Sequence, residues 1–241
     1  MTHTMEMLGR AAVKVKDGKV VEASEPVVRY CPLFAKVRGI KELTAESAAE
    51  NMRFRMEQHG MFTARRKLEM GVFVGFGASE SMMTGLLRGI IDGAVTVCDG
   101  AGTVITANPD LVQGMGGYIS GVAETEPIAE ILEGIGIRNG HVLSPGNAQI
   151  DQLAGARWAA ANGYKRFAVT VSGAEDAEAL RRLEAEAAVR IMIIGVHLTG
   201  ICREDAARLL AVADIVTGCA SLYIRELVRP LVQVGTAVPL F

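Results

Sequence analysis

A cysteine and a carboxylate stand together where a predicted strand ends. The segment VTVCDGAGTVIT (95–106) is a run of β-forming residues that reaches Cys98, continues with Asp99 and then bends at two glycines. Glycine lets the backbone turn tightly and approach a bound group closely. We therefore interpret Asp99 as a candidate catalytic residue; a packed cysteine followed by an ordinary Asp-Gly turn is the alternative. The candidate cofactor-binding residues of this bend are Gly100, Gly102 and Thr103.

Further cysteines lie in comparable positions. Cys219 directly follows the predicted strand DIVTG at the start of a helix, where the helix dipole stabilises a thiolate. Cys31 precedes a proline in an irregular segment that could reach the same edge of a sheet. Three thiolates from separate segments can hold an iron–sulfur cluster or another metal with one coordination position open. The predicted metal ligands are Cys31, Cys98 and Cys219, and Cys202 is a further candidate; three unrelated thiols are the alternative, because dispersed cysteines carry no spacing motif.

Two other residues have side chains suited to chemistry. Ser79, in GFGASESMM, begins a predicted helix whose free N–H groups and dipole favour a small anionic ligand. The segment is not a dinucleotide or phosphate loop, because Glu80 replaces the third glycine of GxGxxG and no lysine follows. His197, near the end of the strand RIMIIGVHL, is a candidate general base. The alternatives are a helix cap at Ser79 and a buried, satisfied histidine at position 197.

These residues need a scaffold that brings strand ends together. From residue 71 onward, short apolar runs alternate with helical runs. The predicted strands are 72–76, 94–98, 103–106, 141–144, 166–171, 190–198, 214–218 and a last one within 231–241. The predicted helices are 79–90, 109–119, 126–136, 148–163, 174–188, 203–213 and 221–228. This order predicts an α/β fold with a mostly parallel, helix-covered open sheet, in which ligands bind at the carboxyl ends of the strands.

The N-terminal part has a different pattern. AAVKVKDGKVVEAS (11–24) alternates apolar and polar residues around Asp-Gly, which predicts a β-hairpin that forms an antiparallel edge or a flap. Thr44 and Gly60 bound a predicted helix at 45–59. We expect residues 1–60 to form a hairpin-and-helix subdomain and residues 61–241 to form the α/β domain.

Composition excludes several classes of protein. Half of the 241 residues are hydrophobic and the formal net charge is −2, which removes the electrostatic argument for nucleic-acid binding. No apolar run approaches the ~18 residues that a transmembrane helix needs. The four cysteines include no CxxC pair, which argues against a disulfide framework. We expect a cytoplasmic protein that does not bind a membrane, and a homo-oligomer is compatible with its apolar composition.

Three stretches resemble the methanogenesis marker protein 8 family. They are GASESMMTGLLRGIIDGAVTVCDGAGTVITANPDLVQGMG, GYKRFAVTV and ADIVTGCAS. The similarity runs from about Arg29, through VRYCPLF, to TAVPLF at Phe241. The resemblance implies a link to methanogenic metabolism but supplies no reaction and no catalytic residues.

Three functional hypotheses follow. The first is an enzyme of anaerobic metabolism with a cysteine-ligated iron–sulfur cluster or other metal at the edge of the sheet, which requires the thiols to lie close together. The second is a metal-free enzyme that uses Cys98 or Cys219 as nucleophile and His197 as base. The third is a non-catalytic accessory or assembly protein for a methanogenic enzyme, which requires an exposed apolar patch.

Overall fold

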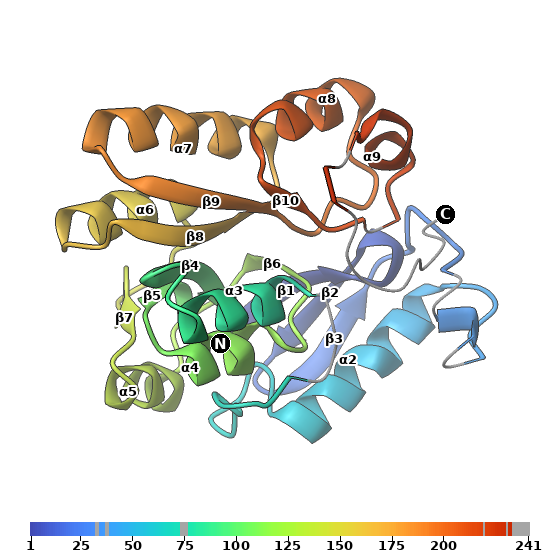
Figure 1. Ribbon diagram of the computed structural model, residues 1–241. Coiled ribbons are helices and arrows are strands. Elements are labelled where there is room, and N and C mark those ends of the chain that lie inside the picture. The colour runs from blue at the N-terminus through green and yellow to red at the C-terminus, as the bar shows by residue number, and fades with distance from the viewer. Residues whose placement is uncertain (32–33, 37–38, 73–76, 219, 230, 233–241) are drawn as a thin grey trace.

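A computed structural model describes residues 1–31, 34–36, 39–72, 77–218, 220–229 and 231–232. It confirms the predicted α/β class, with two sheets and helices that cover the larger one (Figure 1). Residues 73–76 of the predicted strand at 72–76, Cys219 and most of the predicted last strand fall outside the described residues. Among the helices that are described, none combines the length and apolar character needed to cross a membrane.

The larger sheet has six strands in the order β10-β9-β8-β4-β5-β7. Its strands are β4 (Gly93–Cys98), β5 (Gly102–Thr106), β7 (His141–Val142), β8 (Arg166–Val171), β9 (Arg190–Gly195) and β10 (Ile215–Val216). Strands β4, β8, β9 and β10 are parallel, whereas β5 runs antiparallel to both of its neighbours. The register places Val95, Val169 and Ile193 in one row, and all three are fully buried. Ala94 and Ala168, whose side chains project to the opposite face, are also fully buried, so the central parallel strands are covered on both faces.

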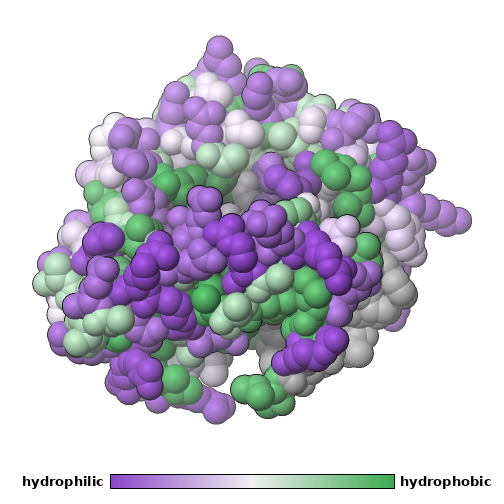
Figure 2. All heavy atoms as spheres, turned by 90° about the horizontal axis from the view of Figure 1, so that it is seen from above, coloured by the Kyte–Doolittle hydropathy of each residue, from purple (hydrophilic) through white to green (hydrophobic). Residues whose placement is uncertain are grey.

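Helices cover both faces of this sheet. Side chains of α6 (Gln152–Ala161), α7 (Ala174–Ala187), α8 (Arg203–Val212) and α9 (Leu222–Leu227) pack with the row at Val95. Side chains of α3 (Ala78–Leu87), α4 (Pro109–Gly116) and α5 (Ala129–Ile137) pack on the opposite face. In Figure 1, α7 and α8 lie above the sheet and α3 and α4 below it. Seen from above in Figure 2, the surface is mainly hydrophilic, with apolar atoms in small patches.

The second sheet is antiparallel, with the order β3-β2-β1-β6. Its strands are β1 (Thr2–Met7), β2 (Ala11–Lys16), β3 (Lys19–Ala23) and β6 (Gly121–Glu124). Helix α2 (Ala45–His59) packs on it, and the buried contacts include Met5, Val13 and Met52. The sheet and α2 together enclose a second core beside the six-stranded sheet.

The N-terminal hairpin and helix were predicted correctly, whereas the antiparallel edge, one of the two placements expected for the hairpin, is not formed. The hairpin β2-β3 and the helix 45–59 are confirmed, and Thr44 and Ser47 form a reciprocal capping box at the start of α2. The hairpin does not extend the parallel sheet. It pairs instead with β1, and β1 pairs with β6 from residues 121–124. The boundary at residue 60 stays a prediction, although the second sheet contains strands from both sides of it.

Candidate functional site

A cavity of about 640 Å³ opens at the carboxyl ends of the parallel strands. Its wall includes the last residues of β4 and β8 and the residues that follow β9 and β10. The first turns of α3, α6 and α7 and the segment 116–122 complete it. Cavities of this size hold metabolites rather than single ions. The predicted location of ligand binding thus coincides with the cavity that the fold forms.

A hydrogen-bonded glutamine stiffens the floor of the cavity. Gln152 Nε2 donates to the carbonyl oxygen of Thr170 at 2.8 Å and contacts its hydroxyl at 3.1 Å. Thr103 Oγ1 donates to Gln152 Oε1 at 2.9 Å. Gln152 therefore joins α6 to β8 and β5, and its side-chain amide is satisfied on both ends. Rigid polar groups of this kind hold a binding surface in one geometry.

His197 lines the cavity two residues after the end of β9. Its Nε2 lies 2.9 Å from Glu6 Oε2, and the two side chains are 17% and 29% exposed. The backbone of His197 has φ of 55°, a left-handed conformation that costs a non-glycine residue about 1–2 kcal/mol. Strained backbone of this kind is concentrated at functional sites. A carboxylate-oriented imidazole is the arrangement that general bases use.

The protonation of Glu6 decides which nitrogen of His197 is available. Burial opposes ionisation of Glu6, but hydrogen bonds from His197 and Arg10 outweigh it and lower the pKa of the carboxyl. An ionised carboxylate only accepts hydrogen bonds, so the Nε2 that faces it carries the hydrogen. In the neutral ring, Nδ1 is then the nitrogen that accepts a proton. Within the described part of the chain, no hydrogen bond engages Nδ1.

Gly121 makes room for this pair. Glu6 and Gly121 face each other in the β1-β6 register, so their Cα substituents lie on the same side of the sheet. A Cβ at Gly121 would lie 2.3 Å from His197 Cδ2 and 2.5 Å from Nε2. Arg55 of α2 holds the adjoining segment by donating to the Tyr118 carbonyl at 2.6 Å and to Ser120 Oγ at 2.9 Å. The small sheet therefore forms one wall of the cavity.

Acidic side chains mark the starts of the helices. Asp151 caps α6 by accepting from the Ala154 N–H at 2.8 Å. Glu80 is buried in the first turn of α3, and Asp176 lies in the first turn of α7. Burial raises the pKa of Asp176, and the nearby negative charges of Asp151 and Glu175 raise it further. The described residues of the cavity wall include these acids and His197, but no lysine or arginine.

The predicted catalytic residue Asp99 lies in the core. It is fully buried, accepts from Arg66 Nε at 2.8 Å and accepts from the Phe62 N–H at 2.7 Å. The Arg66 guanidinium also donates to the Met115 carbonyl at 2.9 Å. Asp99 thus fastens the segment after α2 to the end of β4, and it is not among the residues that line the cavity.

The glycine-rich bend has close neighbours that account for its composition. Gly100 N–H donates to Thr125 Oγ1 at 2.8 Å. Gly102 has φ of 73°, and a Cβ there would lie 2.2 Å from the carbonyl oxygen of Ala148. The hydroxyl of Thr103 also accepts from the Asp151 N–H at 2.8 Å, so it positions the start of α6. None of these three predicted cofactor-binding residues is part of the cavity wall, although Thr103 contacts the wall residues Gln152 and Asp151.

The remaining predicted residues lie in different parts of the structure. Ser79 lines the cavity, but Gly77 is the N-cap of α3, so the alternative role of Ser79 as helix cap is wrong. Cys98 is fully buried among apolar side chains, and burial raises the pKa of its thiol. Cys31 is partly exposed, and Cys202 caps α8 through its sulfur.

The predicted thiolate ligand set remains untested, because Cys219 lies outside the described residues. The described residues contain no group of three or more His, Cys, Asp or Glu side chains arranged to hold a metal ion. The structure therefore does not decide whether Cys31, Cys98 and Cys219 share a metal. Glu6, by contrast, was missed by the sequence reasoning. THTMEM alternates as a strand does, but no sequence feature links it to a histidine 191 positions away.

The fold and cavity define an α/β protein with a ligand-sized cavity at the carboxyl ends of its parallel strands. Residues 3–241 match the family described as "Uncharacterized protein conserved in archaea (DUF2099)", and the chain belongs to this family. It is 48% identical over 242 residues to "Uncharacterized protein MJ0054" of Methanocaldococcus jannaschii, covering 99% of this chain and 85% of that protein. The family match includes the first strand of the chain. No solved structure matches the chain significantly.

Proposed function

We propose that this protein is an enzyme that binds a small metabolite in the strand-end cavity and transfers a proton through His197, oriented by Glu6. The observation that carries the proposal is the 2.9 Å contact between Glu6 and His197 at the cavity wall, made by a histidine with left-handed backbone. Left-handed backbone at a non-glycine residue is concentrated at functional sites, and an acid–base residue must point at its substrate.

The chemistry follows from the two side chains. Nδ1 of the neutral imidazole accepts a proton from an O–H, N–H or activated C–H bond of the substrate, and the bonding electrons remain on the substrate. The resulting imidazolium is stabilised by the Glu6 carboxylate. Return of the proton to a different atom, or to a leaving group, completes an isomerisation or an elimination and restores the neutral ring.

A role in methanogenic metabolism is the finer part of the proposal. It is supported by the family's description as conserved in archaea, by the relative from Methanocaldococcus jannaschii and by the resemblance of residues 77–116 to the marker family. The iron–sulfur or metal site at Cys31, Cys98 and Cys219 is a separate prediction, and the acid–base proposal does not depend on it.

The test is a comparison of metabolite turnover. Wild type, His197→Asn and Glu6→Gln are each incubated with a small-molecule extract of Methanocaldococcus jannaschii cells, and mass spectrometry records which compounds fall and rise. Asparagine tolerates the left-handed backbone, so His197→Asn removes the imidazole with little change of conformation. Glu22→Gln, an exposed carboxylate on β3 that pairs with Lys14, is the matched control.

We expect a substrate–product pair in wild type and in Glu22→Gln. The rate at which the product forms should fall about 10²–10⁴-fold in His197→Asn, the range that general acid–base catalysis supplies. It should fall by a smaller factor in Glu6→Gln, because Glu6 orients the ring but does not transfer the proton. Equal turnover in wild type and His197→Asn would remove His197 from the chemistry. No change in any compound with wild-type protein would refute an enzymatic role in that metabolite pool.

A further inference from the structure

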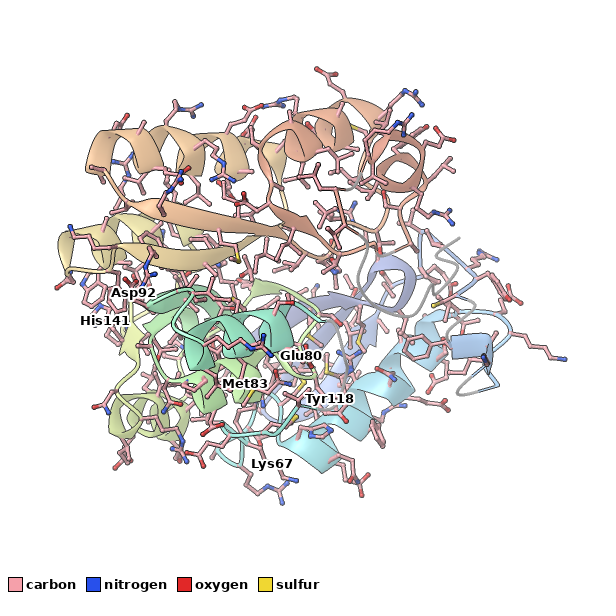
Figure 3. All side chains as sticks on the ribbon, in the orientation of Figure 1. Lys67, Glu80, Met83, Asp92, Tyr118 and His141 are labelled. Carbon is pink, nitrogen blue, oxygen red and sulfur yellow. The ribbon has the colours of Figure 1, made fainter. Side chains whose placement is uncertain are left out.

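We infer that the cavity recognises a metabolite carrying a protonated nitrogen, which binds against the buried carboxylate of Glu80. This inference rests on the proposed function only in using the same cavity, and it names the chemical class of the ligand. Figure 3 shows Glu80 at the end of α3 that lies toward the four-stranded sheet, opposite the end near Asp92. Glu80 is 4% exposed and belongs to the cavity wall.

Glu80 is a buried acid without a cationic partner among the described residues. Ser79 Oγ lies 3.1 Å from its Oε2, and Gln113 Nε2 donates to its Oε1 at 3.0 Å. Both donors are neutral. A buried carboxylate is costly unless it is paired with a positive charge, and the protein side of this pair is missing in the described region. A ligand cation supplies it.

The surroundings of Glu80 are also short of donors. Gln113, which lies behind Glu80 and is not part of the cavity wall, is fully buried, and its Oε1 has no hydrogen-bond partner among the described residues. Buried polar atoms in native proteins are nearly always paired, so each exception calls for a missing group. A carboxylate has about four lone-pair sites, of which two are used here. An ammonium group brings three N–H donors and one positive charge, which match the remaining lone-pair sites and the negative charge of the Glu80 carboxylate at the cavity wall.

The charges across the cavity point in the same direction. Asp151 and Asp176 line it from two other helices, and their proximity contributes to the raised pKa of Asp176. A cation in the cavity relieves the repulsion between these carboxylates, whereas an anion adds to it.

The expected small anionic ligand at Ser79 competes with this inference. The N termini of α3 and α7 have no side-chain cap, and helix N termini attract anions. However, Glu80 and Asp176 occupy the first turns of these two helices and already supply the negative charge that the dipoles favour. The hydroxyl of Ser79 is also directed to Glu80. An anion therefore remains the competing outcome of the test.

The test uses one carbon skeleton with three head groups: benzylamine, benzyl alcohol and benzoate. Binding to the full chain is measured by saturation-transfer NMR and by chemical-shift changes at the cavity. We expect benzylamine to bind at least about tenfold more tightly than either analogue, because only its ammonium group forms a charge-assisted hydrogen bond with Glu80. Glu80→Gln should abolish the preference, whereas Asp110→Asn, an exposed acid in the first turn of α4, should retain it.

A second variant protects the test against misfolding of Glu80→Gln. Asp176→Asn changes an exposed side chain, should fold normally and should reduce the preference about twofold to threefold through the loss of a distant charge. Tighter binding of benzoate, an amine preference that survives Glu80→Gln in folded protein, or no binding of benzylamine at millimolar concentration would each overturn the inference.

These outcomes are separable from those of the proposed function. Loss of turnover in His197→Asn without benzylamine binding would refute only the ligand class. Glu80-dependent amine binding together with normal turnover in His197→Asn would refute only the acid–base role.

Discussion

Replacing Gly121 with alanine should place a methyl group in the space that the His197 ring occupies. The added Cβ would lie 2.3 Å from Cδ2, 2.5 Å from Nε2 and 2.7 Å from Cγ. Carbon atoms in contact prefer about 3.5–4.0 Å, so the ring must retreat by about 1 Å or more. The Nε2–Oε2 distance to Glu6 is now 2.9 Å, and this movement breaks the hydrogen bond.

The magnitude combines two costs and one gain. Overpacking costs about 1–3 kcal/mol, and losing a hydrogen bond to a charged group costs about 1.5–3 kcal/mol, less here because both partners are partly exposed. Alanine also reduces the conformational freedom of the unfolded chain, which offsets about 0.4–1 kcal/mol of these costs. We expect Gly121→Ala to lower the free energy of unfolding by about 2 kcal/mol, which corresponds to about 4–8 °C in Tm for a chain of this size.

Urea unfolding measures this difference through the fluorescence of Trp158, the single tryptophan, which stacks on His141 at 3.8 Å. Nitrogen-15 NMR of the His197 ring reports the broken contact. Gly136→Ala is the matched control, because a Cβ there meets no atom within 4 Å; it should be neutral or stabilising. Wild-type stability of Gly121→Ala together with unchanged His197 signals would refute the assignment of the Glu6–His197 pair.

Further variants test three particular features. His197→Gly should be more stable than His197→Ala by about 1 kcal/mol in urea unfolding, because only glycine adopts the left-handed backbone freely; equal stability would exclude the strain. Asp99→Asn should cost about 3–5 kcal/mol because Arg66 is left buried without a counter-charge, whereas Lys14→Met, from an exposed pair, should cost less than about 1 kcal/mol. Similar losses in both would show that the Asp99 pair is not buried in solution. The predicted thiolate centre should be lost in Cys98→Ala purified without oxygen, as read by iron, zinc and sulfide content; metal unchanged in the variant would remove Cys98 from the ligands.

Local sequence signals located most of the elements correctly. Thr44 and Gly60 bound α2 as predicted, because capping depends on residues within one turn of the helix end. The Asp17-Gly18 turn specified the hairpin for the same reason. Strands β1 and β6 were missed, since β6 has only four residues and its pairing with β1 spans most of the N-terminal half.

Two of the predicted residues belong to the cavity wall. Ser79 and His197 line the cavity, because residues at strand ends and helix starts meet at the carboxyl edge of a parallel sheet. Asp99 follows the same rule of position, yet its carboxylate is directed into the core by Arg66. The identity of a strand end is local information, whereas the direction of a side chain depends on which partner the fold brings to it.

The sequence by itself determined the α/β class, the hairpin and the edge of the sheet where a ligand would bind, because periodicity, caps and turns act over a few residues. Only the tertiary structure decided that Glu6 orients His197, that Arg66 neutralises Asp99, and that Glu80 is buried without a cation among the described residues. These contacts join residues that are 33 or 191 positions apart, or depend on burial by several elements. Electrostatic pairing and desolvation are properties of three-dimensional proximity, so they exist only once the chain has folded.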